Sequence, residues 1–129
     1  EMSDGDVSLL YVSERLQRSY SEGSMVRHVL KALWHMVSRS QQVFIVGLIQ
    51  SDDTVRGGTG WSVELAKMWG KDLWVFDQGR DDWFFWKAGA WHVGLPVITA
   101  TTIAGTGTRV LEEKGKAAIT SLFTRSFLP

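Results

Sequence analysis

The feature that most constrains the fold is an apolar run followed by clustered glycines and then a helical pattern. The run VFIVGLI, residues 43–49, is rich in β-branched residues and short for a helix, which fits a strand buried on both faces. The pattern WSVELAKMWG follows the glycines and stops at Gly70, a common helix end. A second apolar run, Leu73–Phe76, predicts another buried strand. This order predicts a βαβ unit with parallel strands and a right-handed crossover.

Segments before this unit give a weaker pattern. Apolar residues after Ser24 recur at three- and four-residue spacing as far as Val37, which predicts a helix with Ser24 as its cap. The segment DVSLLYVSERLQRSY, residues 6–20, fits either a helical turn or an entry strand.

Segments after the unit predict further elements. Trp83–Trp86 and Trp91–Val93 are strand-like and are joined by KAGA, which predicts a hairpin. The stretch Val97–Thr99 predicts a third sheet strand. A helix is expected from about Val110. Gly115 interrupts its pattern, so the segment could form one helix or two helical pieces.

The composition and charge of the chain argue against several kinds of partner and site. Its 129 residues fit a single domain, residues 1–129. Lys+Arg and Asp+Glu number 14 each, and a neutral chain removes the simplest argument for a nucleic acid or an anionic membrane as partner. The absence of cysteine excludes disulfides, thiolate zinc sites and a cysteine nucleophile. With no bilayer-length apolar run and no signal-peptide layout, we expect a cytoplasmic protein.

Tryptophan is concentrated in one stretch. Five of the seven tryptophans lie within 23 residues: Trp69, Trp74, Trp83, Trp86 and Trp91. Rings of this size usually fill a core or an oligomer contact. Stacking on a base or a sugar is the alternative.

The glycine loop between the first strand and the helix has the composition of an anion site. The amino end of a helix leaves unpaired N–H groups and a partial positive charge, and glycines let a ligand approach the backbone. Phosphate is the natural guest at such a loop. The alternative is a tight turn that binds nothing. The candidate binding residues here are Gly47, Gly57, Gly58, Thr59 and Gly60.

The loop resembles a known family motif. The residues GGTGWSVE, 57–64, resemble the G-G-x-G-T-x-x-E motif of the LOG family, which hydrolyses the N-glycosidic bond of nucleoside 5′-monophosphates. LOG proteins belong to the SLOG superfamily of Rossmann-like, nucleotide-binding domains. The chain departs from the motif at Trp61, where LOG enzymes have Thr, and at Arg56, where they have Pro.

A closer resemblance is to uncharacterised phage and bacterial SLOG proteins. They read GGTGWAVQMA, KPVYVFDQ and FAGIGTR, and this chain is similar from about Trp34 to Phe127. The resemblance implies an α/β, three-layer Rossmann-like domain with a mainly parallel sheet and an inserted Trp-rich β-hairpin. Those relatives also carry an earlier strand with an SGGAxGAD-type loop. No such loop precedes residue 24, so either the domain lacks that strand or the strand lies outside this sequence. Absence of the loop would remove half of the expected pocket.

The resemblance also implies roles for individual residues. Glu64 matches the LOG glutamate that works beside the ribose, and Arg27 is the candidate for the arginine that assists it. The alternative for Glu64 is a carboxylate that interacts favourably with the helix dipole in the first turn. The alternative for Arg27 is an arginine on the exposed face of a helix. In the second glycine turn, AGTGTR, Gly107, Thr108 and Arg109 are candidates for ligand or subunit contact. Asp77, after the second strand, either accepts hydrogen bonds from ribose hydroxyls or caps the following turn.

These patterns lead to three functional hypotheses. The leading one is binding of a nucleotide or another phosphate-bearing small molecule at residues 57–60. The second is LOG-like hydrolysis of nucleoside 5′-monophosphates, and the third is a non-catalytic interaction module. We expect no metal and no cofactor, since His28, His35 and His92 show no metal-ligand spacing. The resemblance to LOG enzymes implies a homodimer.

Overall fold

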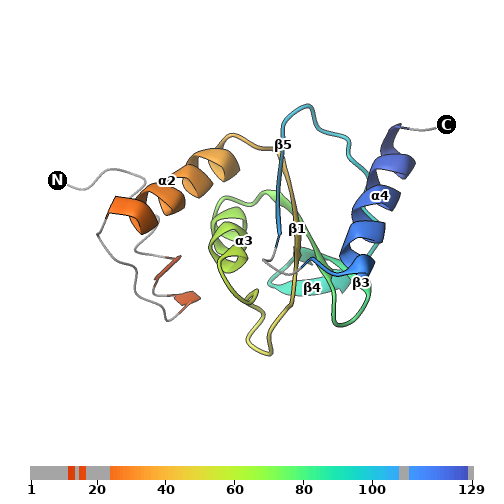
Figure 1. Cartoon of the computed structure of the whole chain (residues 1–129), viewed down its shortest axis with the longest axis horizontal. Coiled ribbons are helices and arrows are strands. Elements are labelled where there is room, and N and C mark those ends of the chain that lie inside the picture. Colours follow the sequence, from red (N-terminus) through yellow and green to blue (C-terminus); the bar gives the residue numbers. More distant parts are fainter. Residues whose placement is uncertain (1–11, 14, 17–23, 108–110, 128–129) are drawn as a thin grey trace.

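The chain forms an α/β fold with a five-stranded sheet between helices (Figure 1). The structure, a computed structural model, describes residues 12–13, 15–16, 24–107 and 111–127. The elements, in chain order, are α2 Ser24–Ser38, β1 Gln42–Gly47, α3 Thr59–Met68, β2 Asp72–Asp77, β3 Asp82–Lys87, β4 Ala90–Val93, β5 Ile103–Gly107 and α4 Glu113–Phe127.

The sheet is mixed, and the expectation of a mainly parallel sheet is wrong. Its strand order is β4-β3-β2-β1-β5. Strand β1 pairs in parallel with β2 and β5, whereas β3 pairs antiparallel with both β2 and β4. The short connection between β2 and β3 makes the chain turn back on itself, which gives antiparallel pairing. The Trp-rich hairpin therefore extends the sheet beyond β2.

The hairpin and the βαβ unit are confirmed. A two-residue turn joins β3 to β4, and both of its residues, Ala88 and Gly89, have positive φ (54° and 75°), as in the primed turns that suit hairpins. Helix α3 begins two residues before Trp61 and ends near Gly70, whose φ of 62° fits a helix stop. The Lys71 N–H donates to the carbonyl of Ala66 at 2.9 Å, which closes that end.

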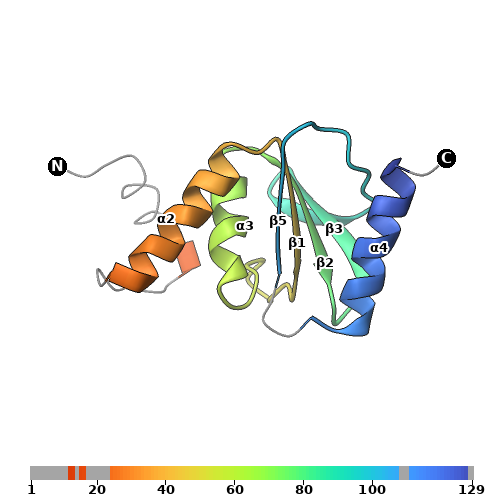
Figure 2. The same cartoon turned by 45° about the horizontal axis from the view of Figure 1, so that its top comes forward.

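Helices cover both faces of the sheet. Helix α3 lies between α2 and the sheet, and α4 lies on the opposite face (Figure 2). Successive side chains of β1 enter different cores: Val43 and Ile45 join the cluster on the α3 side, and Phe44 and Val46 join the cluster that contains α4 residues. All six residues of β1 are buried, which confirms a strand covered on both faces.

The tryptophans belong to these two cores. Trp61 and Trp83 are buried, and the others are partly buried against one cluster or the other: Trp34, Trp69, Trp74, Trp86 and Trp91. Trp86 and Trp91 face each other across the hairpin with ring centroids 5.0 Å apart. Core packing therefore accounts for the tryptophan content.

The third sheet strand was placed wrongly by the sequence pattern. Val97–Thr99 is irregular, and the backbone N–H groups of Thr99 and Ala100 donate to the Gln42 side-chain oxygen at 2.9 and 3.0 Å. The strand that joins the sheet is β5, inside the segment expected to form a glycine turn. Its glycines are accommodated because backbone pairing with β1 needs no side chain.

Predictions for the two ends of the chain, α4 and the segment 6–20, have different outcomes. Helix α4 runs without a break through Gly115, so the two-piece alternative is wrong. Its expected start near Val110 lies outside the described residues. In the segment 6–20, residues 12–13 and 15–16 are helical, which favours the helical alternative there. None of the helices in the described ranges has the length and apolar character to cross a bilayer.

Candidate functional site

The glycine loop lies at the edge of the sheet where its parallel strands end. Strands β1, β2 and β5 end at Gly47, Asp77 and Gly107, and the loop leads from β1 into α3 at that edge (Figure 2). The connection after β1 covers one face of the sheet and the helix after β5 covers the other. Ligands of open α/β sheets bind outside such a switch point, at the carboxyl ends of the strands.

The turn at Gly57 and Gly58 is open to solvent. Both residues are exposed, and a Cβ added to either would meet no atom within 4 Å. Gly57 has a φ of 79°, a conformation that favours glycine. Gly58 caps α3 without a side-chain hydrogen bond. The end of the helix is therefore accessible to a ligand from outside.

Two backbone amides of this turn have no partner among the described residues. The N–H groups of Gly60 and Trp61 donate to the carbonyls of Gly57 and Gly58, at 3.0 and 3.2 Å. The N–H groups of Gly58 and Thr59 form no hydrogen bond within the part of the chain that the structure describes. Free amides at the amino end of a helix are donors for an anion.

Gly47 and Thr59 shape the loop from beneath. A Cβ at Gly47 would lie 2.9 Å from Val55 Cγ1, closer than real contacts allow, so a glycine lets the loop pack onto β1. Thr59 is buried and its hydroxyl donates to the carbonyl of Arg56 at 3.1 Å. Both residues support the turn, and Gly60 is buried in the first turn of α3.

Glu64 lies in a buried ion cluster. Its side chain is 3% exposed, with Lys67 Nζ 2.8 Å from Oε2 and Arg15 Nε 3.5 Å from Oε1. Arg15 is therefore one arginine beside it. The side chain of Arg27, the arginine indicated by the family resemblance, lies outside the described part of the structure, so its role stays a prediction. Lys67, three residues after Glu64 on a predicted helix, could have been found from its spacing.

Lys67 joins three parts of the molecule. Its ammonium group donates to the Asp53 carbonyl at 2.9 Å and lies 3.9 Å from the centroid of the Trp86 ring. The indole N–H of Trp91 donates to the same carbonyl at 2.9 Å. Burial lowers the pKa of Lys67 below its ordinary 10.5, and Glu64 partly opposes this shift. The cluster holds the loop before the glycines against α3 and the hairpin.

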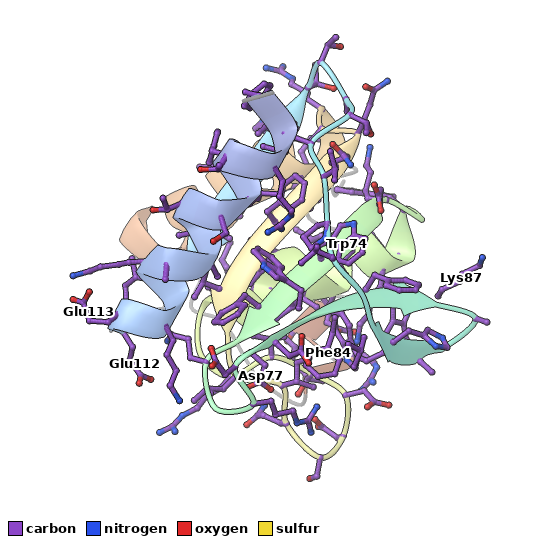
Figure 3. All side chains as sticks on the ribbon, turned by 90° about the vertical axis from the view of Figure 1, so that its right-hand side faces the viewer. Trp74, Asp77, Phe84, Lys87, Glu112 and Glu113 are labelled. Carbon is purple, nitrogen blue, oxygen red and sulfur yellow. The ribbon has the colours of Figure 1, made fainter. Side chains whose placement is uncertain are left out.

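Asp77 closes the turn after β2. Its Oδ1 accepts hydrogen bonds from the N–H groups of Gly79 (2.8 Å) and Arg80 (3.1 Å), and its Oδ2 accepts one from Ile49 (3.2 Å). These contacts match the turn-capping alternative, and contact with ribose hydroxyls stays a prediction. Figure 3 shows Asp77 at the same edge of the sheet as the start of α4, which Glu112 precedes.

The second glycine turn is described only in part. Gly107 is exposed at the end of β5. Thr108 and Arg109 lie outside the described residues, so their roles stay predictions. After the gap, the Glu112 N–H donates to the Gln78 side-chain oxygen at 2.7 Å, which links α4 to the end of β2.

The loop between β1 and the glycines gives a pH-dependent prediction. Asp52 Oδ1 accepts hydrogen bonds from the N–H and the hydroxyl of Thr54, which lower the pKa of Asp52 below its ordinary 3.8. The hydrogen bonds to the ionised Asp52 carboxylate therefore stabilise the folded state above pH 3.8, and this stabilisation is lost as pH falls through the pKa of Asp52 in the folded chain. We expect the Thr54 amide signal in NMR spectra to titrate below pH 3.8. In Thr54→Val the midpoint should move upward, and an unchanged midpoint would contradict the assigned cause.

Comparison of the chain with protein-family models, curated proteins and solved structures finds no match. In the described ranges, no three His, Cys, Asp or Glu side chains gather closely enough to hold a metal ion. The site is therefore defined by its own geometry: an open glycine turn at the carboxyl edge of parallel strands, with two amides that have no partner in the described ranges.

Proposed function

We propose that this chain binds a nucleotide or another phosphate-bearing small molecule at the glycine loop. The observation that supports the proposal most directly is that the N–H groups of Gly58 and Thr59 have no partner among the described residues, at a turn whose Gly57 and Gly58 are exposed. An anion placed there would accept both hydrogen bonds and meet the positive end of the α3 dipole. The residue at the cap position, Gly58, has no side chain to accept these hydrogen bonds in its place.

The surroundings of the turn add support. Arg56 is exposed directly before Gly57 and brings a positive charge to the loop, and arginine is well suited to phosphate. The parallel half of the sheet, β2-β1-β5, has the strand, loop and helix order of a Rossmann-like nucleotide site. The resemblance to SLOG proteins supports the same ligand class.

Binding without turnover is the form of the proposal that the geometry favours. N-glycosidic hydrolysis would need Glu64 to reach a substrate, and its carboxylate is 3% exposed and paired with Lys67 and Arg15. Both ion pairs would have to open before that carboxylate could act.

The proposal predicts that removing one amide weakens binding. Gly58 has a φ of −61°, which proline also adopts, so Gly58→Pro deletes the N–H with little demand on φ. Hydrogen bonds to charged groups contribute about 1.5–3 kcal/mol. We therefore expect AMP to bind about tenfold to a hundredfold more weakly to Gly58→Pro, measured by calorimetry at fixed salt.

Gly58→Ala is the matched control, because it keeps the N–H and its Cβ would meet nothing within 4 Å. It should bind AMP as the wild-type chain does. Adenosine and inorganic phosphate, measured in parallel, separate recognition of the nucleoside from recognition of the anion. Equal affinity of both variants, or no binding of AMP or phosphate by the wild-type chain, would overturn the proposal.

A further inference from the structure

A second candidate site lies on the opposite side of the sheet from α3. A cavity of about 340 Å³ opens between the β1–β5 part of the sheet and α4. Phe44, Val46 and the backbone of β5 form its floor, and its walls come from the hairpin, the irregular segment before β5, and α4. The wall and rim residues include Trp83, Ile98, Ile103, Leu111, Ile119, Leu122 and Phe123.

The cavity exists because β5 contributes no side chains to its floor. Gly105 pairs with Phe44 and Gly107 pairs with Val46, and paired residues of neighbouring strands point to the same face of a sheet. A Cβ at either glycine would meet no atom closer than 3.8 Å. Side chains would therefore fit at both positions and bury apolar surface, yet the space is open.

The size and lining of the cavity favour a flat occupant. Its volume falls at the small end of the usual range of ligand sites, about 300–1,000 Å³. The floor is strand backbone at Gly105 and Gly107, and the aromatic rings of Phe44, Trp83 and Phe123 are among the lining groups. Aromatic rings pack well against other flat groups.

The chemistry of the lining indicates a neutral occupant. Thr106 is the one polar residue among the described residues that line the cavity, and its pairing with Ile45 directs its side chain to the α3 face of the sheet. No charged residue is among these lining residues. An ionic group placed against these residues would lose its hydration without a compensating partner among them.

We infer that the cavity between β5 and α4 binds a neutral, planar aromatic small molecule of one or two fused rings, about the size of indole. This site is independent of the glycine loop, since it needs neither the free amides nor a negative charge. Ile103, Leu111 and Phe123 are 37–45% exposed and form the rim through which the ring enters.

The test uses 5-fluoroindole as the probe and fluorine NMR as the readout. The wild-type chain should give a saturable shift and broadening of the probe signal. Gly105→Val places an apolar side chain in the cavity and should weaken binding at least tenfold. The same substitution should leave Tm unchanged or raise it by roughly 2–5 °C, because it adds buried apolar surface and replaces glycine in a strand.

Ala117→Val is the matched control, because Ala117 is exposed on α4 and does not line the cavity; it should bind the probe as the wild-type chain does. If Gly105→Val fails to fold, Gly107→Ala tests the same floor with a smaller group. Absence of saturable binding, or equal binding by the floor variants, overturns the inference. It is also overturned if ultracentrifugation shows a dimer that Gly105→Val dissociates while the probe has no effect, because the cavity would then be a contact between copies.

Discussion

Replacing Lys67 with methionine is expected to lower the free energy of unfolding by about 3–5 kcal/mol, because it leaves the buried Glu64 carboxylate without its nearest cation. Lys67 Nζ lies 2.8 Å from that carboxylate, and both side chains are at most 8% exposed. The substitution also removes the hydrogen bond to the Asp53 carbonyl and the contact with the Trp86 ring. Urea denaturation followed by tryptophan fluorescence measures the change.

The chain offers a matched control on its surface. Lys116 and Glu113 form the same i,i+3 pair in α4, with Nζ and Oε1 3.2 Å apart, but both side chains are more than half exposed. Lys116→Met should cost less than about 1 kcal/mol. Glu64→Gln should also be strongly destabilising, and combining it with Lys67→Met should cost less than the sum of the single changes. Similar losses for Lys67→Met and Lys116→Met would show that the buried pair has no special weight.

Substituting Gly115 with valine is expected to destabilise the chain by about 3 kcal/mol, at the upper end of the usual cost of overpacking. A Cβ at this position would lie 2.5 Å from Gln78 Oε1 and 2.9 Å from Val46 Cγ1. The valine side chain of Val46 is stiff, and moving Gln78 would break its hydrogen bond to the Glu112 N–H. Helix α4 must therefore shift away from the sheet.

The direction of this effect is informative, because glycine in an exposed helix is usually less favourable than other residues. Ala117→Val, two residues along the same helix and exposed, should change stability by less than about 1 kcal/mol. Thermal and urea unfolding give the magnitudes. Hydrogen exchange at the Glu112 amide should become faster in Gly115→Val. A stability equal to that of the wild-type chain would mean that α4 does not pack as closely as described.

Local patterns predicted the central elements well. The β-branched run at 43–49 and the helical spacing after Gly60 indicated β1 and α3 because their periods are encoded within a few residues. The hairpin was equally readable, since two strand-like runs, Trp83–Trp86 and Trp91–Val93, flank the short segment KAGA. Interactions between residues close in sequence determine these elements, so the local sequence is enough to predict them.

Strand β5 shows where local reasoning fails. Its sequence, IAGTG, has two glycines, which favour turns over strands. Pairing with β1 at Gln42–Val46 makes it a strand, and that partner lies far away in the sequence. The parallel pairing of β1 with β2 and the hairpin were predicted, but the antiparallel pairing of the hairpin with β2 was not, because a hairpin alone does not reveal which edge it joins.

The candidate site was predictable in its backbone and less so in its side chains. The glycine turn and the amino end of α3 follow from local sequence. The burial of Glu64 depends on Arg15, which lies in a segment with no clear period, and on Asp53 and Trp91, which meet Lys67 only in the folded chain. Because residues from several distant segments form the environment of Glu64, the sequence of no single segment predicts it.

The placement of β5 has a consequence for how the molecule reaches its native state. Residues 42–93 contain β1 to β4 and can assemble through contacts between neighbours in sequence, whereas β5 must return across the whole of that unit to meet β1. Closing so long a stretch costs chain entropy before any contact compensates for it. Strand β5 and α4 are therefore expected to dock last, and the cavity between them would be completed only in this final step of folding.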